Sequence, residues 1–139
     1  MNSITKTPRF WQIVFLLAAV WNFAGATIAF SDLEANATTF FFASPDQVHP
    51  VFKMMLVLFW WTVFTFGVGY LIVAYNPRKN QGILIVAALG KSACGGCWIL
   101  GFWNGQVSST AFAVGIGDLA FALVFVLYLS FVWLGSKSR

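Results

Sequence analysis

The chain has 139 residues, of which 60% are hydrophobic and 9% are charged, and its formal net charge is +4. A soluble domain carries about 25% charged residues because its surface faces water. This composition therefore excludes a soluble enzyme, a nucleic-acid-binding protein and a disordered chain. In a membrane protein, an excess of basic residues reports orientation rather than a polyanionic partner.

Four stretches are long and apolar enough to cross a bilayer, which takes roughly 20 residues in a helix. They cover residues 10–30, 51–75, 82–103 and 110–134. None of them shows the alternation of apolar and polar residues that the strands of a membrane barrel require. We therefore expect an all-α membrane protein: a single domain over residues 1–139, folded as a four-transmembrane-helix bundle.

The first span has an alternative interpretation. Lys6 and Arg9 precede an apolar run, and the small residues at 24–26 resemble the cleavage site of a secretory signal peptide. The apolar run continues to Phe30 and is long enough to span the membrane. We expect an uncleaved first helix, and the rest of the topology is the same in both cases.

The loop at 31–50 is too short for a catalytic domain. The three phenylalanines at 40–42 are expected to lie in the membrane interface, and the Asn-Ala-Thr sequence at 36–38 is formally a glycosylation acceptor. His49, the single histidine of the sequence, is close to Asp46. One histidine with one or two carboxylates does not make a metal site, so we expect no metal and a structural or solvated His49.

The basic residues define an orientation by the positive-inside rule. In the four-span arrangement, one side receives Lys6, Arg9, Arg78, Lys79, Lys137 and Arg139, whereas the other receives Lys53 together with Asp32, Glu34 and Asp46. We therefore expect both termini and the turn at Pro77 to be cytoplasmic, in a bacterial inner membrane.

Lys91 and Asp118 are ionisable residues inside predicted spans. Such a residue at the centre of a membrane helix costs about 2.5–3.5 kcal/mol on insertion scales, so it usually faces a partner or a cavity. The two residues are almost equally far along the chain from the turn at 104–105. In an antiparallel hairpin they reach the same depth, and we expect them to form an ion pair.

Asn22 and Thr62 reach a similar depth on the first two spans, as judged from the helical rise of 1.5 Å per residue. A polar layer of Asn22, Thr62, Lys91 and Asp118 could bind the head of a lipophilic ligand, relay a proton or dock a partner helix. Alternatively, Lys91 and Asp118 form an internal pair that only fixes the register of the helices. Trp60 and Trp61 could flank a flat ligand, although packing is the simpler explanation.

Cys94 and Cys97 have the C-x-x-C spacing of redox proteins and lie on one helix face. A membrane thiol oxidant that reduces quinone uses such a pair, but this chain has no further cysteines to pass electrons to a substrate. Buried thiols in apolar surroundings are inert. We favour a packing face of small residues, which would contain Gly90, Ala93, Cys94, Gly95, Gly96, Cys97 and Gly101.

Several short motifs carry a resemblance to known proteins: Gly-Val-Gly-Tyr at 67–70, Asn-Pro-Arg at 76–78, Leu-Gly-Lys at 89–91, and Asp118 followed by Phe121 and Tyr128. On these motifs, somewhat under half of the chain resembles a group of small, uncharacterised four-helix bacterial membrane proteins. The architecture is also similar to DoxX-like proteins, some of which are small subunits of membrane oxidoreductases. The resemblance implies a bundle that accompanies other proteins, and it supplies no catalytic residues.

The sequence does not assemble a catalytic set of nucleophile, base and orienting group, because the single histidine is in a loop. We expect an accessory subunit, or a binder of a lipid-soluble small molecule, without catalysis of its own. One alternative is a thiol–quinone redox protein that uses Cys94 and Cys97, with quinone as cofactor. Another is an oligomeric small-solute or proton-coupled transporter. The expected partners are the lipid bilayer and either another membrane protein or further copies of the chain, but no nucleic acid.

Overall fold

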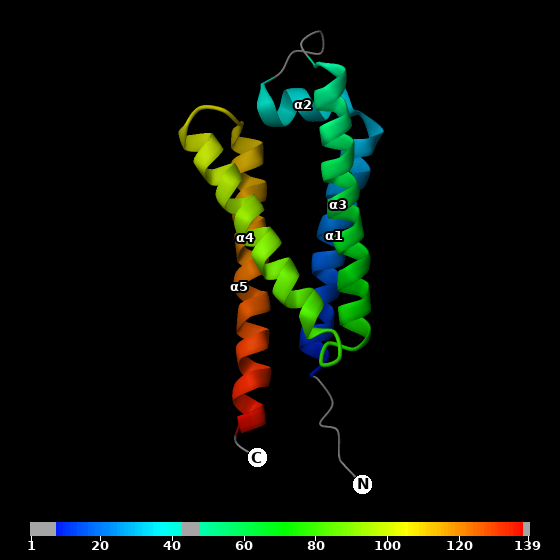
Figure 1. Cartoon of the computed structure of the whole chain (residues 1–139), viewed down its shortest axis with the longest axis vertical. Helices are drawn as coiled ribbons and strands as arrows, with labels where there is room; N and C mark the ends of the chain where they lie inside the picture. Colours follow the sequence, from blue (N-terminus) through cyan, green and yellow to red (C-terminus); the bar gives the residue numbers. More distant parts are fainter. Residues whose placement is uncertain (1–7, 43–47, 138–139) are drawn as a thin grey trace.

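The structure is a computed structural model that describes residues 8–42 and 48–137 of the chain. Over these ranges it is all-α, with helices in the order α1 (Arg9–Ser31), α2 (Leu33–Phe41), α3 (Pro50–Tyr75), α4 (Gln81–Trp103) and α5 (Ser109–Lys137). Figure 1 shows four long helices running along one axis and the short α2 lying across one end.

The four long helices confirm the predicted spans. Each is long and apolar enough to cross a membrane, with a mean hydropathy between 1.8 and 2.2 over its most apolar window. Large apolar side chains point outward from the bundle, as in Leu17, Leu58, Leu89 and Leu123, which are 55–69% exposed. Such surfaces are stable against lipid and not against water. The chain is therefore a small multi-pass membrane protein.

The short helix α2 is a correction to the expected four-helix architecture. It begins after Asp32, whose carboxylate accepts hydrogen bonds from the backbone N–H groups of Glu34 and Ala35, at 3.0 and 2.9 Å. An aspartate at this position satisfies two N–H groups that the first helical turn leaves without partners. The helix ends at Phe41 and is followed by Phe42, which adopts a left-handed φ of 57°.

The sequence predicts that the three phenylalanines at 40–42 all lie in the membrane interface, but the structure places them in different environments. Phe40 is 9% exposed and packs in the core, Phe41 is half-buried, and Phe42 is 63% exposed. Phe40 and Phe41 are consecutive residues of α2 and point in different directions, and Phe42 follows the helix with left-handed backbone. One of them therefore becomes part of the protein interior instead of lying in the interface.

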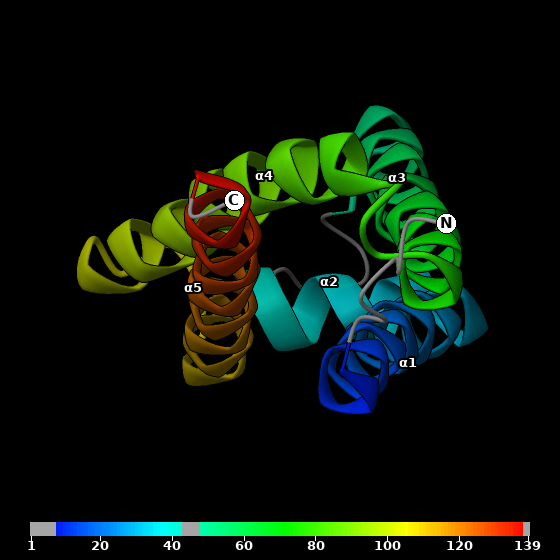
Figure 2. The same ribbon diagram turned by 90° about the horizontal axis from the view of Figure 1, so that it is seen from below.

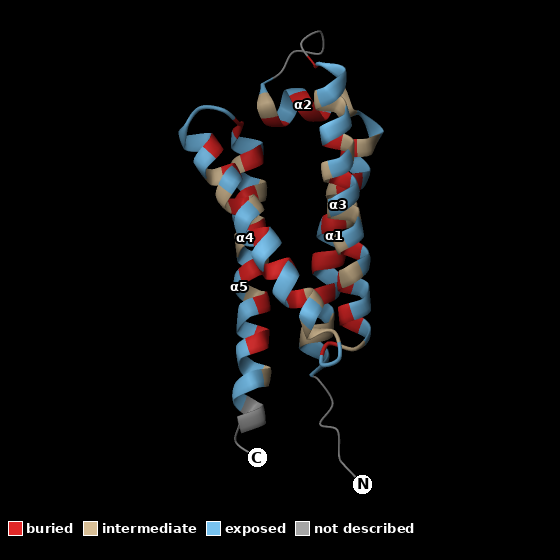
Figure 3. Ribbon diagram, viewed as in Figure 1, coloured by how far each residue is buried: buried red, intermediate tan, exposed pale blue. Residues whose placement is uncertain are grey.

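The long helices form two pairs, α1 with α3 and α4 with α5 (Figures 1 and 2). The backbones of the two pairs meet where α3 ends and α4 begins, at the end of the molecule where α1 begins. There buried residues of all four helices form one cluster, and Figure 3 marks buried positions in red along the ribbon. We call this cluster the terminal core; its largest members are Phe15, Tyr70, Leu84, Phe125 and Tyr128.

The opposite end is built differently, because α2 lies between the pairs and contacts α1, α3 and α5. Its buried cluster contains Phe40 of α2, Leu56 and Trp60 of α3, and Trp98 of α4. We call this cluster the α2 core. The two cores leave space between the helix pairs, and that space forms the site described below.

Helices α4 and α5 approach each other closely at two glycines. A Cβ atom added to Gly95 would lie 2.8 Å from the carbonyl oxygen of Gly115, and one added to Gly115 would lie 2.7 Å from the Cβ of Trp98. These distances are shorter than side chains tolerate, so the crossing depends on glycine at both positions. Gly95 is four residues after Lys91 on α4, so the crossing brings the predicted ion pair to the same level.

The packing face predicted around the C-x-x-C sequence is only partly formed. Gly95 and Gly101 are buried, and a Cβ on Gly101 would lie 3.3 Å from Val107. By contrast, Ala93 and Cys97 are exposed, and a Cβ on Gly96 would meet nothing within 4 Å. The small residues extend around α4, so only one side of the helix contacts α5.

Candidate functional site

The predicted ion pair of Lys91 and Asp118 is present, and it is buried. The ammonium Nζ of Lys91 donates a hydrogen bond to Oδ1 of Asp118 and a second one, 3.1 Å long, to Oδ1 of Asn22. The two side chains of the pair are only 8% and 11% exposed. The ammonium also lies 5.5 Å from the ring centroid of Phe121 and 6.0 Å from that of Tyr70. Lys91 is therefore surrounded by favourable partners.

Asn22 extends this network to the other helix pair. Its Nδ2 donates a 2.9 Å hydrogen bond to the backbone carbonyl of Val63 on α3, while its Oδ1 accepts from Lys91 on α4. One amide thus connects α1, α3 and α4, and the ion pair adds α5. We call Asn22, Lys91 and Asp118 the polar floor.

Thr62 does not join the polar floor, although the sequence placed it in the same layer. Its hydroxyl donates a 2.9 Å hydrogen bond to the carbonyl of Leu58, one turn earlier on α3. A threonine in a helix commonly satisfies its hydroxyl in this way. The side chain is exposed and lines the same cavity as the polar floor. It forms no hydrogen bond with Asn22, Lys91 or Asp118 in the structure.

A cavity of about 530 Å³ lies between the two helix pairs, directly on the polar floor. Its lining comes from all of the described helices: α1, α2, α3, α4 and α5. The volume falls within the range of about 300–1,000 Å³ that is typical of small-molecule sites. Lys91 and Trp98 both line it and are seven residues apart on α4, which places them about 10 Å apart along the helix axis.

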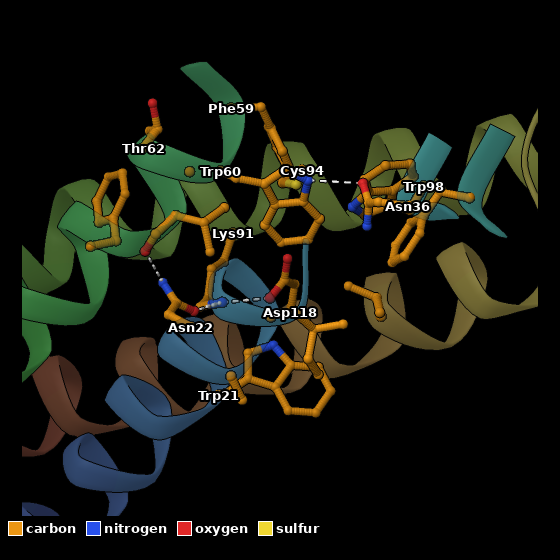
Figure 4. A pocket seen from close by; sticks show the side chains of 18 of the residues that line it. Trp21, Asn22, Asn36, Phe59, Trp60, Thr62, Lys91, Cys94, Trp98 and Asp118 are labelled. Carbon is orange, nitrogen blue, oxygen red and sulfur yellow. Dashed lines mark hydrogen bonds and ion pairs between the residues drawn. The ribbon is translucent and has the colours of Figure 1, made fainter. Parts of the chain in front are cut away.

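Aromatic side chains dominate the sides of the cavity (Figure 4). We call this group the aromatic wall; it consists of Trp21, Phe40, Phe59, Trp60, Phe66, Tyr70 and Trp98. The two tryptophans singled out in the sequence separate here. Trp60 is 5% exposed and faces inward, whereas Trp61 is 54% exposed on the outer surface of α3. The pair therefore does not flank a ligand together.

The end of the cavity opposite the polar floor is covered by α2. Asn36 of α2 is 7% exposed, and its Oδ1 accepts a 3.0 Å hydrogen bond from the indole Nε1 of Trp60. Sequence reasoning treated Asn36 only as a formal glycosylation acceptor, and this buried position corrects that interpretation. The capping Asp32 was the signal that could have revealed α2 and, with it, the inward-facing side of this helix.

Asp118 has a second carboxylate oxygen, Oδ2, that forms no hydrogen bond with the part of the chain that the structure describes. Figure 4 shows this oxygen on the side of the carboxylate away from Lys91. Asp118 is itself a lining residue. The polar floor therefore presents an unused acceptor to an otherwise apolar cavity.

The two cysteines of the C-x-x-C sequence are free thiols in different surroundings. Cys94 is half-buried and lines the cavity, whereas Cys97 is exposed and is not a lining residue. Three residues along a helix rotate the side chain by about 300°, so the two thiols share a broad face but their directions differ by about 60°. A narrow cavity can therefore contact Cys94 without contacting Cys97. The structure therefore brings only Cys94 near the polar floor.

His49 has a structural position at the beginning of α3. Its Nδ1 accepts a 3.2 Å hydrogen bond from the backbone N–H of Val51, and Pro50 occupies the first helical position. The neighbouring Asp46 lies outside the described residues. Within residues 8–42 and 48–137, no group of three or more histidine, cysteine and acidic side chains could hold a metal ion.

Comparison of the chain with protein-family models, with curated proteins and with solved structures yields no match. The fold and the site define a class, a small multi-pass membrane protein with a cavity between its helix pairs, and no family is identified. The resemblance to DoxX-like proteins stays a prediction.

Proposed function

We propose that this protein binds a lipid-soluble small molecule in the cavity between its helix pairs and has no catalytic chemistry of its own. The observation that carries the proposal is the cavity itself: about 530 Å³ in volume, lined by all of the long helices and closed at one end by buried polar groups. We further propose that both termini lie in the cytoplasm, with the protein in a bacterial inner membrane, because the basic residues gather at that side.

The surroundings of the cavity support entry from the bilayer. Trp21 and Ile28 of α1 line the cavity and are 40% and 69% exposed, so this side of the cavity is accessible from outside the protein. A molecule dissolved in lipid meets this surface without crossing water. Because lipid tails are as apolar as the cavity, transfer from lipid brings little hydrophobic gain. Selective binding then depends on the polar floor and on contact with the aromatic wall.

Native mass spectrometry of the protein extracted with its surrounding lipid tests the proposal. We expect a bound small molecule on the wild-type chain. Val114→Trp should remove it, because Val114 lines the cavity and an indole there fills the space. Val126→Trp is the matched control, since Val126 is 49% exposed on the same helix and is not a lining residue. Retention of the molecule by both variants would contradict the proposal.

The same spectra distinguish the alternatives. A stoichiometric second protein with an empty cavity would favour the accessory subunit, and a bare homo-oligomer would favour a transporter. The redox alternative has weaker support, because Cys97 does not line the cavity that a quinone would occupy. If the protein has thiol–quinone activity, Cys94→Ser must abolish it.

A further inference from the structure

We propose that the ligand of this cavity is a neutral lipophilic phenol, a flat ring whose hydroxyl donates a hydrogen bond to Oδ2 of Asp118. This inference rests on the proposed function, because it names the chemical class of a molecule bound at the same site. It follows from three properties of the described residues: which hydrogen-bonding positions are left unused, the net charge of the polar floor, and the character of the cavity walls.

The unused hydrogen-bonding position of the polar floor favours a ligand that donates. Lys91 already donates to Asp118 and to Asn22, and two aromatic rings lie near its ammonium. Asn22 uses its oxygen for Lys91 and its nitrogen for the carbonyl of Val63. Within the polar floor, Asp118 keeps an oxygen without a partner among the described residues, and the residue is only 8% exposed. The buried indole Nε1 of Trp98, which also lines the cavity, has no acceptor either, but it lies about two helical turns from Lys91 along α4. A buried acceptor is costly unless a donor reaches it.

The net charge of the polar floor favours a neutral donor. Lys91 and Asp118 compensate each other, and the structure places no further ionised side chain among the lining residues. A ligand ammonium or carboxylate would have to leave water without a countercharge waiting for it, which is expensive in a medium of low dielectric. Transfer of a hydroxyl from water costs far less free energy, and one charge-assisted hydrogen bond compensates for that cost.

The aromatic wall favours a flat ring over a flexible alcohol chain. It contributes aromatic faces and edges from α1, α2, α3 and α4 around the space above Asp118. Aromatic rings gain from offset or edge-to-face contact beyond the area that they bury. A ring also loses less conformational freedom on binding than an alkyl chain of similar size. A hydroxyl attached to such a ring is a phenol.

The test compares para-butylphenol with para-butylanisole, in which a methyl group replaces the hydroxyl hydrogen and removes the hydrogen-bond donor. Equilibrium dialysis measures how much of each probe binds to nanodiscs that contain the wild-type protein. Subtracting the amount bound by empty nanodiscs corrects for partition of the probe into lipid. We expect the phenol to bind at least about tenfold more tightly, as a hydrogen bond to a charged acceptor provides. Equal binding of the two probes would overturn the inference and leave the proposed function standing. If neither probe binds, the inference is overturned, whereas the proposed function is decided separately by native mass spectrometry.

Two variants identify the acceptor. Replacing Lys91 by Met and Asp118 by Leu together removes the pair without leaving a lone charge, and we expect this double variant to bind the phenol and the anisole alike. Thr62→Val is the matched control, because Thr62 lines the cavity but gives its hydroxyl to Leu58. Its preference for the phenol should equal that of the wild type. A preference that persists in the double variant would overturn the role of Asp118, and the wild-type comparison decides the inference even if that variant does not fold.

Discussion

Two lysine–carboxylate pairs in the described part of the chain place the same chemistry in different surroundings. Lys91 and Asp118 connect the middles of α4 and α5, and their side chains are 8% and 11% exposed. Lys53 and Glu34 connect the beginning of α3 to α2, and their side chains are 40% and 47% exposed. In the first pair each charge is stabilised mainly by its partner, because little solvent reaches it. In the second pair each charge is also stabilised by solvent.

This difference decides what each pair contributes. At a surface, water and salt screen the attraction, and ordering two long side chains offsets much of what remains. In the interior, the desolvation of both charges is large, so the pair adds little net stability, but a single remaining charge is very unfavourable. We therefore expect the inner pair to restrict how the four long helices pack, and the outer pair to have only a small effect on the attachment of α2.

The largest effect is expected from breaking the inner pair. Lys91→Met leaves Asp118 charged in an apolar site, and we expect the free energy of unfolding to fall by about 3–5 kcal/mol. Unfolding in mixed micelles of a mild detergent and dodecyl sulfate measures this change. A loss below about 1 kcal/mol would mean that Asp118 does not depend on Lys91 for its stability in the interior.

Combining Lys91→Met with Asp118→Leu should recover much of that loss, because no unpaired charge remains. The polar contact from Lys91 to Asn22 is still missing, so we expect recovery to be incomplete. The same unfolding assay on the wild type, the two single variants and the double variant gives the coupling energy. A double variant no more stable than either single variant would show that the two residues do not act as a pair.

A smaller effect is expected from separating the helices that carry the inner pair. Gly95→Ala places a Cβ 2.8 Å from the carbonyl oxygen of Gly115, and relieving that contact moves α4 and α5 apart. We expect a loss of about 1–3 kcal/mol, the usual cost of overpacking. The adjacent Gly96→Ala is the control, because its Cβ meets nothing within 4 Å. Its stability, measured in the same micelles, should equal or slightly exceed that of the wild type.

The sequence predicts features that follow from a pattern within one helix or hairpin, but not those that depend on contacts between distant elements. The long helices follow from uninterrupted apolar runs, and the inner pair follows from counting residues to one turn, because the lipid permits few alternatives. The cavity could not be predicted in this way. It exists because the helix pairs diverge and α2 enters between them, and neither the divergence nor the contact of Asn36 with Trp60 leaves a periodic pattern.

Two residues show the same limit within the site. Thr62 has the depth of the polar floor but points along its own helix, and Cys97 has the spacing of a redox partner but lies on the exposed side of α4. Depth and spacing can be read from a sequence, since the rise of a helix is constant. The rotation of each helix about its axis is set by packing against the others.

The attachment of α2, which carries Glu34 of the outer pair, provides a further test. Asp32→Ala removes the acceptor for the N–H groups of Glu34 and Ala35, and we expect a loss of about 1 kcal/mol in the local stability of α2. Hydrogen exchange of those two amides measures it directly. Ser31→Ala is the control, because the Ser31 hydroxyl donates back to Ile28 and caps nothing in α2. Equal exchange in both variants would contradict the cap.

The smallest effect is expected from the outer pair itself. Lys53→Met leaves Glu34 with access to solvent, so we expect the free energy of unfolding to change by less than about 1 kcal/mol. Raising the salt concentration to about 1 M should abolish even this difference between wild type and variant, because the screening length falls to about 3 Å. The difference caused by Lys91→Met should persist at the same salt concentration, since ions do not enter the apolar interior. If the two lysine variants respond equally to salt, burial is not what separates the two pairs.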